Sequence, residues 1–176
     1  GGTGAVQLYR ETVLPLAPRD TRPGDWASTQ NNLGNALLAL GTRGDDAALG
    51  DALAAFTAAL EVRTRQRSVS EWAATQGNLA LALLELGERG DDRALRRAIE
   101  INRALLEAFP RDRTPIDWAK VQNNLGNALT ILGQRGDSQA LRDATAAYRA
   151  ALEVQTRDRT PQSWAIVQNN LGNTLR

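Results

Sequence analysis

Clusters of side-chain amides are the residues in this sequence with the clearest capacity for binding. The motif Gln-Asn-Asn-x-x-Asn begins at Gln30, Gln122 and Gln168, and a reduced form keeps Gln76 and Asn78. A carboxamide both donates and accepts hydrogen bonds, so it matches the N–H and C=O groups of a peptide backbone. Asn is a mediocre helix former, so its recurrence within helical sequence needs a reason. The chemistry available at these clusters is neutral recognition of polar groups.

The residues that usually carry enzymatic or metal chemistry are largely missing. The 176 residues contain no His, Cys or Met, and Lys120 is the one lysine among 21 basic side chains. Imidazole bases, thiol nucleophiles, disulfides and Cys or His metal sites are thereby excluded. Acidic pairs such as Asp45-Asp46 recur at expected helix starts, where the helix dipole alone favours them. We predict that the protein is not an enzyme and needs no cofactor or metal.

A fixed period of 46 residues organises the chain. The tryptophans follow it at Trp26, Trp72, Trp118 and Trp164. Apolar residues recur at helical spacing within each unit, so the period predicts stacked helix pairs. Units begin near residues 22, 68, 114 and 160, after a partial second helix over residues 5–18. We expect residues 5–176 to form a single repeat domain within a longer protein, and residues 1–4 to be a flexible tail or a cloning scar.

Start and stop signals divide each unit into a first helix, A, and a second helix, B. Side chains of Ser68 and Thr114 are expected to cap A helices, with Pro115 at the first helical position. A glycine at the end of each A helix predicts a left-handed residue at Gly41, Gly87 and Gly133. The B helices are expected to start at Asp45, Asp91 and Asp137. In the opening helical segment, prolines predict an early kink or end at Pro15 and Pro18.

This pattern resembles the tetratricopeptide repeat, which pairs Leu-Gly on helix A with Ala-x-x-x-aromatic on helix B. The matching residues are Leu33-Gly34 with Ala52-x-x-x-Phe56, and Leu125-Gly126 with Ala144-x-x-x-Tyr148. The likeness covers residues 5–176 and looks closest to long-repeat bacterial versions and to the kinesin light chain type. It implies an all-α fold, a right-handed solenoid of antiparallel helix pairs. A period of 46 also lies in the HEAT and armadillo range, but the order of the two signals favours the tetratricopeptide repeat.

Two interpretations divide the amides. Hydrogen bonds between neighbouring helices account for Gln30, Asn32 and their repeats, which occur in every unit. The other amides lie four residues apart on one face, which lines a concave groove in the resembled family. These candidate ligand-binding residues are Asn31, Asn35, Asn123, Asn127, Asn169 and Asn173.

The resemblance adds candidates from family members that hold a peptide C-terminus with basic and Asn residues. Their positions fall on Asn35, Asn78 and Lys120, whereas two of the basic positions carry Asn31 and Asn124. Each charged hydrogen bond contributes roughly 1.5–3 kcal/mol, so the loss of two cations weakens carboxylate capture. A neutral segment held through its backbone is the better match.

The leading hypothesis is a cytoplasmic protein-interaction scaffold that binds a peptide or protein segment in an Asn-lined groove. The alternative is a structural spacer or a self-assembling array, because the terminal helices of two copies could rebuild a hairpin head to tail. No nucleic-acid partner is expected at a net charge of +1, and the arginines of 63–67 are predicted to be a solvated helix end. No membrane contact is expected, because no apolar run approaches about 20 residues.

Two further motifs have both a binding and a structural interpretation. Arg-Gly-Asp occurs at three A–B turns, at Arg43, Arg89 and Arg135, and spells a short integrin-recognition motif. A turn glycine followed by a helix-capping aspartate explains the same letters. The tryptophans could stack on bases or sugars, but they share a stripe with the Leu-Gly leucines, which favours packing between repeats.

Overall fold

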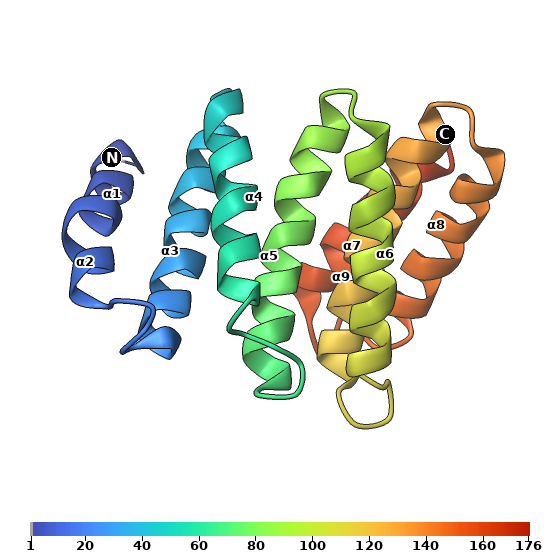
Figure 1. Cartoon of the computed structure of the whole chain (residues 1–176). Helices are drawn as coiled ribbons and strands as arrows, with labels where there is room; N and C mark the ends of the chain where they lie inside the picture. Colours follow the sequence, from blue (N-terminus) through green and yellow to red (C-terminus); the bar gives the residue numbers. More distant parts are fainter. Residues whose placement is uncertain (1) are drawn as a thin grey trace. The chain divides into compact units, whose positions relative to one another are not determined.

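A succession of helices makes up the framework, and the computed structural model describes residues 2–176 (Figure 1). The opening segment consists of α1 (Gly2–Leu8), the π-helix η1 (Tyr9–Val13) and α2 (Leu14–Leu16). Three A–B pairs and a last A helix follow. They are α3 (Pro23–Gly41) with α4 (Asp46–Leu60), α5 (Val69–Glu88) with α6 (Asp92–Ala108), α7 (Pro115–Gln134) with α8 (Ser138–Leu152), and finally α9 (Pro161–Thr174). The all-α class and the order of elements are confirmed, and the handedness of the solenoid stays a prediction.

The chain divides into two compact units, the first ending at Leu86 and the second running from Gly87 to Arg176. In the first unit α3 packs on α4 and against the opening segment. In the second unit α7 packs on both α6 and α8, and α8 packs on α9. Within each unit short turns make consecutive helices antiparallel, and alanines and leucines fill most of the space between them.

The opening segment has a defined irregularity. Leu14 N–H bonds to the Tyr9 carbonyl, five residues back, which is the π-helical pattern. One residue more lies between Tyr9 and Leu14 than between their counterparts Phe56 and Leu60, and a π turn absorbs such an insertion. The helical segment ends at Leu16, between the two prolines, so the predicted end is confirmed. Helix α1 extends back to Gly2 where a flexible tail was expected over residues 1–4, and Gly1 lies outside the described residues.

The starts of the A helices differ in part from expectation. The Ser68 hydroxyl oxygen accepts from the Glu71 backbone N–H over 3.3 Å, so that cap is confirmed. The expected side-chain cap at Thr114 is wrong, because its hydroxyl donates to the Pro110 carbonyl of the preceding turn over 3.1 Å. Pro115 occupies the first turn as predicted. An A helix can therefore begin without a side-chain cap when a proline presets its first turn.

The A–B turns correct the prediction about glycines. The left-handed residues are Gly44, Gly90 and Gly136, with φ of 105°, 113° and 107°. The predicted glycines, Gly41, Gly87 and Gly133, lie at helix ends instead, where a Cβ would collide with Leu49, Leu95 and Leu141 of the following B helix. Those earlier glycines are required for close packing, and the glycines of Arg-Gly-Asp are required for the turn.

The aspartates of Arg-Gly-Asp begin the B helices as predicted. The carboxylate of Asp45 accepts from Ala48 N–H, and that of Asp137 accepts from Ala140 N–H, each over 3.0 Å. Arg135 also has structural partners, because its guanidinium donates to the Gly87 carbonyl and pairs with Asp92. The structural interpretation of this motif, a turn glycine followed by a helix-capping aspartate, is thereby supported.

In two of the A–B pairs, α3 with α4 and α7 with α8, a glycine packs against an aromatic ring. A Cβ placed on Gly34 would lie 2.5 Å from the ring of Phe56, and one on Gly126 would lie 2.6 Å from the ring of Tyr148. Both rings are fully buried. The Leu-Gly and Ala-x-x-x-aromatic signals therefore describe one contact between two helices.

Candidate functional site

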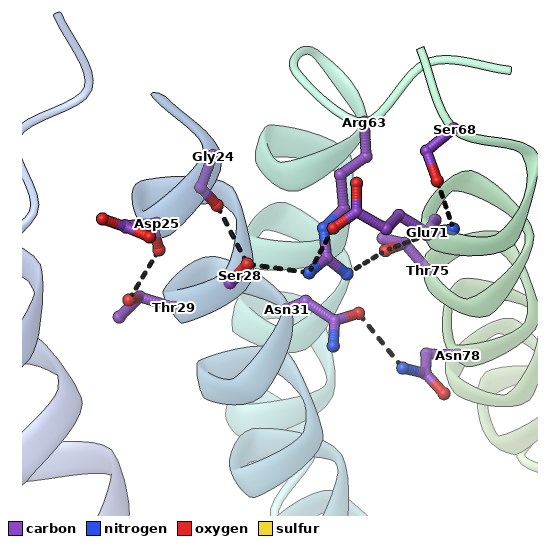
Figure 2. A network of polar contacts seen from close by, with 10 residues as sticks. All are labelled: Gly24, Asp25, Ser28, Thr29, Asn31, Arg63, Ser68, Glu71, Thr75 and Asn78. Carbon is purple, nitrogen blue, oxygen red and sulfur yellow. Dashed lines mark hydrogen bonds and ion pairs between the residues drawn. The ribbon is translucent and has the colours of Figure 1, made fainter. Parts of the chain in front are cut away.

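An amide hydrogen bond joins the two A helices of the first unit. Asn78 of α5 donates from Nδ2 to Oδ1 of Asn31 on α3 over 3.1 Å, and Figure 2 shows the two carboxamides facing each other. Asn31 is buried and Asn78 is half-buried. Asn78 repeats Asn32, so its predicted bond between neighbouring helices is confirmed. The oxygen of Asn31, a predicted ligand contact, is used within the protein.

A denser version of this contact joins α7 to α9. Asn170 donates from Nδ2 to Oδ1 of Asn123 over 3.1 Å and to Oδ1 of Asn127 over 3.0 Å. The Tyr148 hydroxyl donates to the same oxygen of Asn127 over 2.8 Å, which includes α8 in the network. Asn170 also repeats Asn32, so this bond between helices was expected. Asn123 and Asn127, predicted to face a ligand, serve as its acceptors.

The remaining predicted ligand-binding residues lie at the surface. Asn35 of α3 and Asn169 and Asn173 of α9 are exposed. Lys120 of α7 is also exposed, and its ammonium lies 3.3 Å from a carboxylate oxygen of Asp117. These four side chains are available to a partner, and their role as ligand contacts stays a prediction.

Arg63 is a residue whose role sequence reasoning missed. Its guanidinium donates to the Ser28 hydroxyl over 2.9 Å and to the Thr75 hydroxyl over 3.1 Å, and it approaches Glu71 at 3.9 Å (Figure 2). Ser28 and Thr75 each donate their own proton to a backbone carbonyl, which leaves their lone pairs to accept from Arg63. The guanidinium thus fixes the spacing of α3 and α5.

The expected solvated helix end is wrong for Arg63, whose side chain is only 12% exposed. The sequence did hold a signal. The equivalent positions are Ala17 one period earlier, Phe109 one period later and Gln155 two periods later, which are not the residues of a solvated face. A site shared by alanine and phenylalanine is an inward-facing site, and an arginine there needs internal partners.

Gln155 occupies the equivalent place in the second unit and borders a cavity. The cavity measures about 110 Å³ and lies between α7 and α9, beside Lys120, Asn123, Asn124 and Ser163. Gln155 is 2% exposed, and its Oε1 has no hydrogen-bond partner among the described residues. Unpartnered buried oxygens are uncommon in proteins, so this atom marks an unsatisfied site.

The tryptophans are covered by arginines. The distances from guanidinium carbon to ring centre are 4.9 Å for Arg19 on Trp26, 5.7 Å for Arg65 on Trp72, 5.1 Å for Arg111 on Trp118 and 5.9 Å for Arg157 on Trp164. Each arginine lies in the turn before its A helix. Arg111 also pairs with Glu153 over 2.7 Å, so the stacked cation is held on its other side. Stacking of a guanidinium on each half-buried ring occupies one ring face, and packing of the tryptophans between repeats stays a prediction.

Two larger cavities lie between the B helices α6 and α8, with α7 beneath them. They measure about 250 and about 340 Å³, and Arg103, Leu129 and Asp143 border both. Sequence reasoning singled out no residue here, although a signal existed. Helix α6 carries Arg93, Arg96, Arg97 and Arg103 where α4 carries Ala47, Gly50, Asp51 and Thr57, so a B helix forms without these arginines.

Tyr148 has the clearest perturbation of a titratable group. Burial raises the pKa of the Tyr148 hydroxyl, and hydrogen bonds with Thr130 and Thr174 oppose part of that rise. Among residues 2–176, no group of three His, Cys, Asp or Glu side chains is arranged to hold a metal ion. Over the same residues, no helix has the length and apolarity that a membrane crossing requires.

A comparison with protein families supports the pattern seen in the geometry. Residues 72–112, which contain most of α5 and all of α6, match the family model described as Tetratricopeptide repeat. One 46-residue repeat of this chain therefore matches the tetratricopeptide repeat. The match is to a repeat scaffold and brings no catalytic family with it. A comparison with curated proteins found no match. The likeness to the kinesin light chain type stays a prediction, as does the cytoplasmic compartment.

Proposed function

We propose that the chain is a protein-interaction scaffold that binds a peptide or protein segment along the exposed amides of its A helices. Tetratricopeptide repeats generally bind proteins, and residues 72–112 match that repeat. The proposed contacts are Asn35 of α3 in the first compact unit, and Asn169 and Asn173 of α9 in the second. Lys120 of α7 is the one cation among the proposed contacts. The family match supports the general role, and the amides are this proposal's choice of contact.

The observation that carries the proposal is the exposure of these three asparagines. An internal Asn is less favourable than Ala in a helix by about 0.6 kcal/mol. Asn31 and Asn123 offset that cost with hydrogen bonds between helices. Asn35, Asn169 and Asn173 are exposed and lie outside those bonds. Their carboxamides are therefore available to form hydrogen bonds with a partner.

The electrostatics favour a neutral segment. Lys120 is the one cation among the proposed contacts, and Asp117 pairs with it at 3.3 Å. A lone, exposed, already paired ammonium gives a carboxylate little net attraction. The carboxamides offer a donor and an acceptor each, which suits the alternating groups of a peptide backbone.

The experiment starts with peptides selected on the immobilised chain from a displayed random library, whose affinities are then measured by calorimetry. Changing Asn169 and Asn173 together to Ala removes two amide contacts. At about 1 kcal/mol each, this weakens binding at least about tenfold. The control variant changes two exposed arginines of α8, Arg142 and Arg149, to Ala and should bind as the parent does. Equal affinity of the asparagine variant and the parent would contradict the proposal.

The second candidate function is head-to-tail self-association. Gly34 and Gly126 each pack against an aromatic ring, whereas the equivalent Gly172 of α9 faces open space. Leu175, just after α9, is exposed. Leu8 and Leu16 are exposed on the opening segment. A ring from the opening segment of a second copy would fit the Gly172 position as Tyr148 fits Gly126.

Sedimentation over a wide concentration range tests this second candidate. Open chains of copies are expected, since the contact joins two different surfaces. Gly172→Leu fills the open position and should lower the association. A species that stays monomeric up to roughly millimolar concentration, a scale of about −4 kcal/mol, would contradict it.

A further inference from the structure

The cavity beside Gln155 has a filled counterpart elsewhere in the same chain. In the first unit the guanidinium of Arg63 lies between α3 and α5, on Ser28, Glu71 and Thr75. Two periods further on, these four positions are Gln155, Lys120, Ser163 and Val167, and all four border the cavity between α7 and α9. The first unit therefore shows what this space holds when it is occupied by a planar polar group (Figure 2).

The substitutions change what the space can hold. Gln155 is shorter than arginine, which leaves about 110 Å³ open, the room of about three or four water molecules. Lys120 replaces Ser28 and Ser163 replaces Glu71, so over the four positions the anion is lost and the one cation moves from the place of Arg63 to the place of Ser28. A second cation such as a ligand guanidinium is disfavoured beside Lys120. Asp117 already pairs with Lys120, so an anion is not strongly favoured either.

The unpartnered atom defines the chemistry that is missing. Gln155 Oε1 is buried and accepts no hydrogen bond within the described residues, so it lacks a donor. Asn124 and Ser163, also at the cavity, can donate to an acceptor. A group that fits must be small, planar, neutral, and both donor and acceptor.

We propose that this cavity binds an amide group, whose N–H donates to Gln155 Oε1 and whose carbonyl accepts from Asn124 and Ser163. The group is the side-chain carboxamide of an Asn or Gln, or a backbone amide, of a bound segment. This inference deepens the proposed function, on which it rests, because it names the chemical group that one part of the A-helix surface accepts.

Acetamide tests the cavity with no partner present. A titration of the full, isotope-labelled chain is followed by NMR, with N-methylacetamide, sodium acetate and guanidinium chloride in parallel at matched ionic strength. Acetamide should give saturable shifts in the millimolar range at the side-chain amides of Gln155, Asn123 and Asn124. Weaker binding of N-methylacetamide than of acetamide assigns the cavity to Asn or Gln side chains, and equal or tighter binding assigns it to a backbone amide.

Variants establish whether the oxygen of Gln155 is responsible. Gln155→Met keeps the length of the side chain and removes the acceptor, so it should weaken acetamide binding about tenfold. Gln139→Met, at an exposed position of α8, is the matched control and should change nothing. Ser163→Ala leaves the turn that contains Gln155 intact and should weaken acetamide binding about threefold. This variant keeps the test available if Gln155→Met misfolds.

Several outcomes would overturn the inference. They are the absence of saturable shifts at the cavity, equal binding of acetate or guanidinium, and undiminished acetamide binding by both Gln155→Met and Ser163→Ala. This failure differs from failure of the proposed function. The acetamide titration uses no peptide, so its result does not depend on peptide binding, and the peptide affinities are measured without acetamide.

Discussion

Replacing Asn170 by Ala removes the donor that joins α7 to α9, and replacing its neighbour Asn169 by Ala removes only an exposed amide. Asn170 Nδ2 serves Oδ1 of both Asn123 and Asn127. Each bond contributes about 1 kcal/mol, and the substitution recovers about 0.6 kcal/mol of helix propensity. Tyr148 still donates to Asn127, so among the described residues the Asn123 oxygen is the one left without its donor. Asn170→Ala should therefore lower the free energy of unfolding by about 1–2 kcal/mol.

Asn169→Ala provides the matched control on the adjacent residue. It loses no hydrogen bond to any residue of 2–176 and gains the same helix propensity, so it should raise the free energy of unfolding by about 0.5 kcal/mol. Urea unfolding followed by circular dichroism measures both, with the midpoint compared at constant slope. Equal midpoints for the two variants would refute the distinction between amides that join helices and amides left for a partner.

Four other substitutions test the packing, the titration and the capping. Gly126→Ala should destabilise the chain by about 1–3 kcal/mol because its Cβ meets the ring of Tyr148, whereas Gly172→Ala meets open space and should stabilise it by about 0.5–1 kcal/mol in thermal melts. Burial raises the pKa of Tyr148 above its unfolded value, so the stability contributed by the protonated hydroxyl is fully present below about pH 10 and is lost as the pH rises further. In a pH series of urea melts, Tyr148→Phe should therefore flatten the fall in stability above about pH 10. Asp137→Ala removes the acceptor for Ala140 N–H and should cost about 1 kcal/mol in the same melts, whereas an unchanged midpoint would count against capping by Arg-Gly-Asp.

The order of helices was predictable because it depends on features that repeat. A 46-residue period, apolar residues at helical spacing and Asp at each B-helix start all indicate the same elements. The contacts of Gly34 with Phe56 and of Gly126 with Tyr148 were also accessible, since a small residue and a ring recur in register. The turn glycines were not. Gly41 and Gly44 both suit a helix end, and only the collision with Leu49 shows which of them needs its missing Cβ for packing.

The division of the amides could be predicted only in part. Adjacent positions on a helix differ by about 100° in direction, so Asn31 and Asn32 lie on either side of one face. Which of them turns inward depends on the packing of the next A helix. The structure buries Asn31 and leaves Asn32 exposed, although Asn78 and Asn170, the repeats of Asn32, supply the donors. Repeats of one sequence position thus have different environments.

The buried polar positions at the B–A turns were missed for a different reason. Arg63 stands in a run of charged residues, and charge alone indicates solvent. Its burial depends on two hydroxyl acceptors that lie on separate helices, Ser28 and Thr75. Gln155 carries no charge and has no such partners, so nothing in its local sequence marks it. Only comparison across periods, with the structure in place, relates the two.

Mapping of a selected peptide on the chain by NMR tests the central claim most directly. The scaffold interpretation predicts that backbone and side-chain amide signals of Asn35, Asn169 or Asn173 shift on binding, together with that of Lys120. The cavities between α6 and α8 provide the internal comparison, and signals near Arg96 and Arg103 should stay in place. Shifts confined to Arg96, Arg103 and their neighbours would contradict the claim and assign partner binding to the B helices.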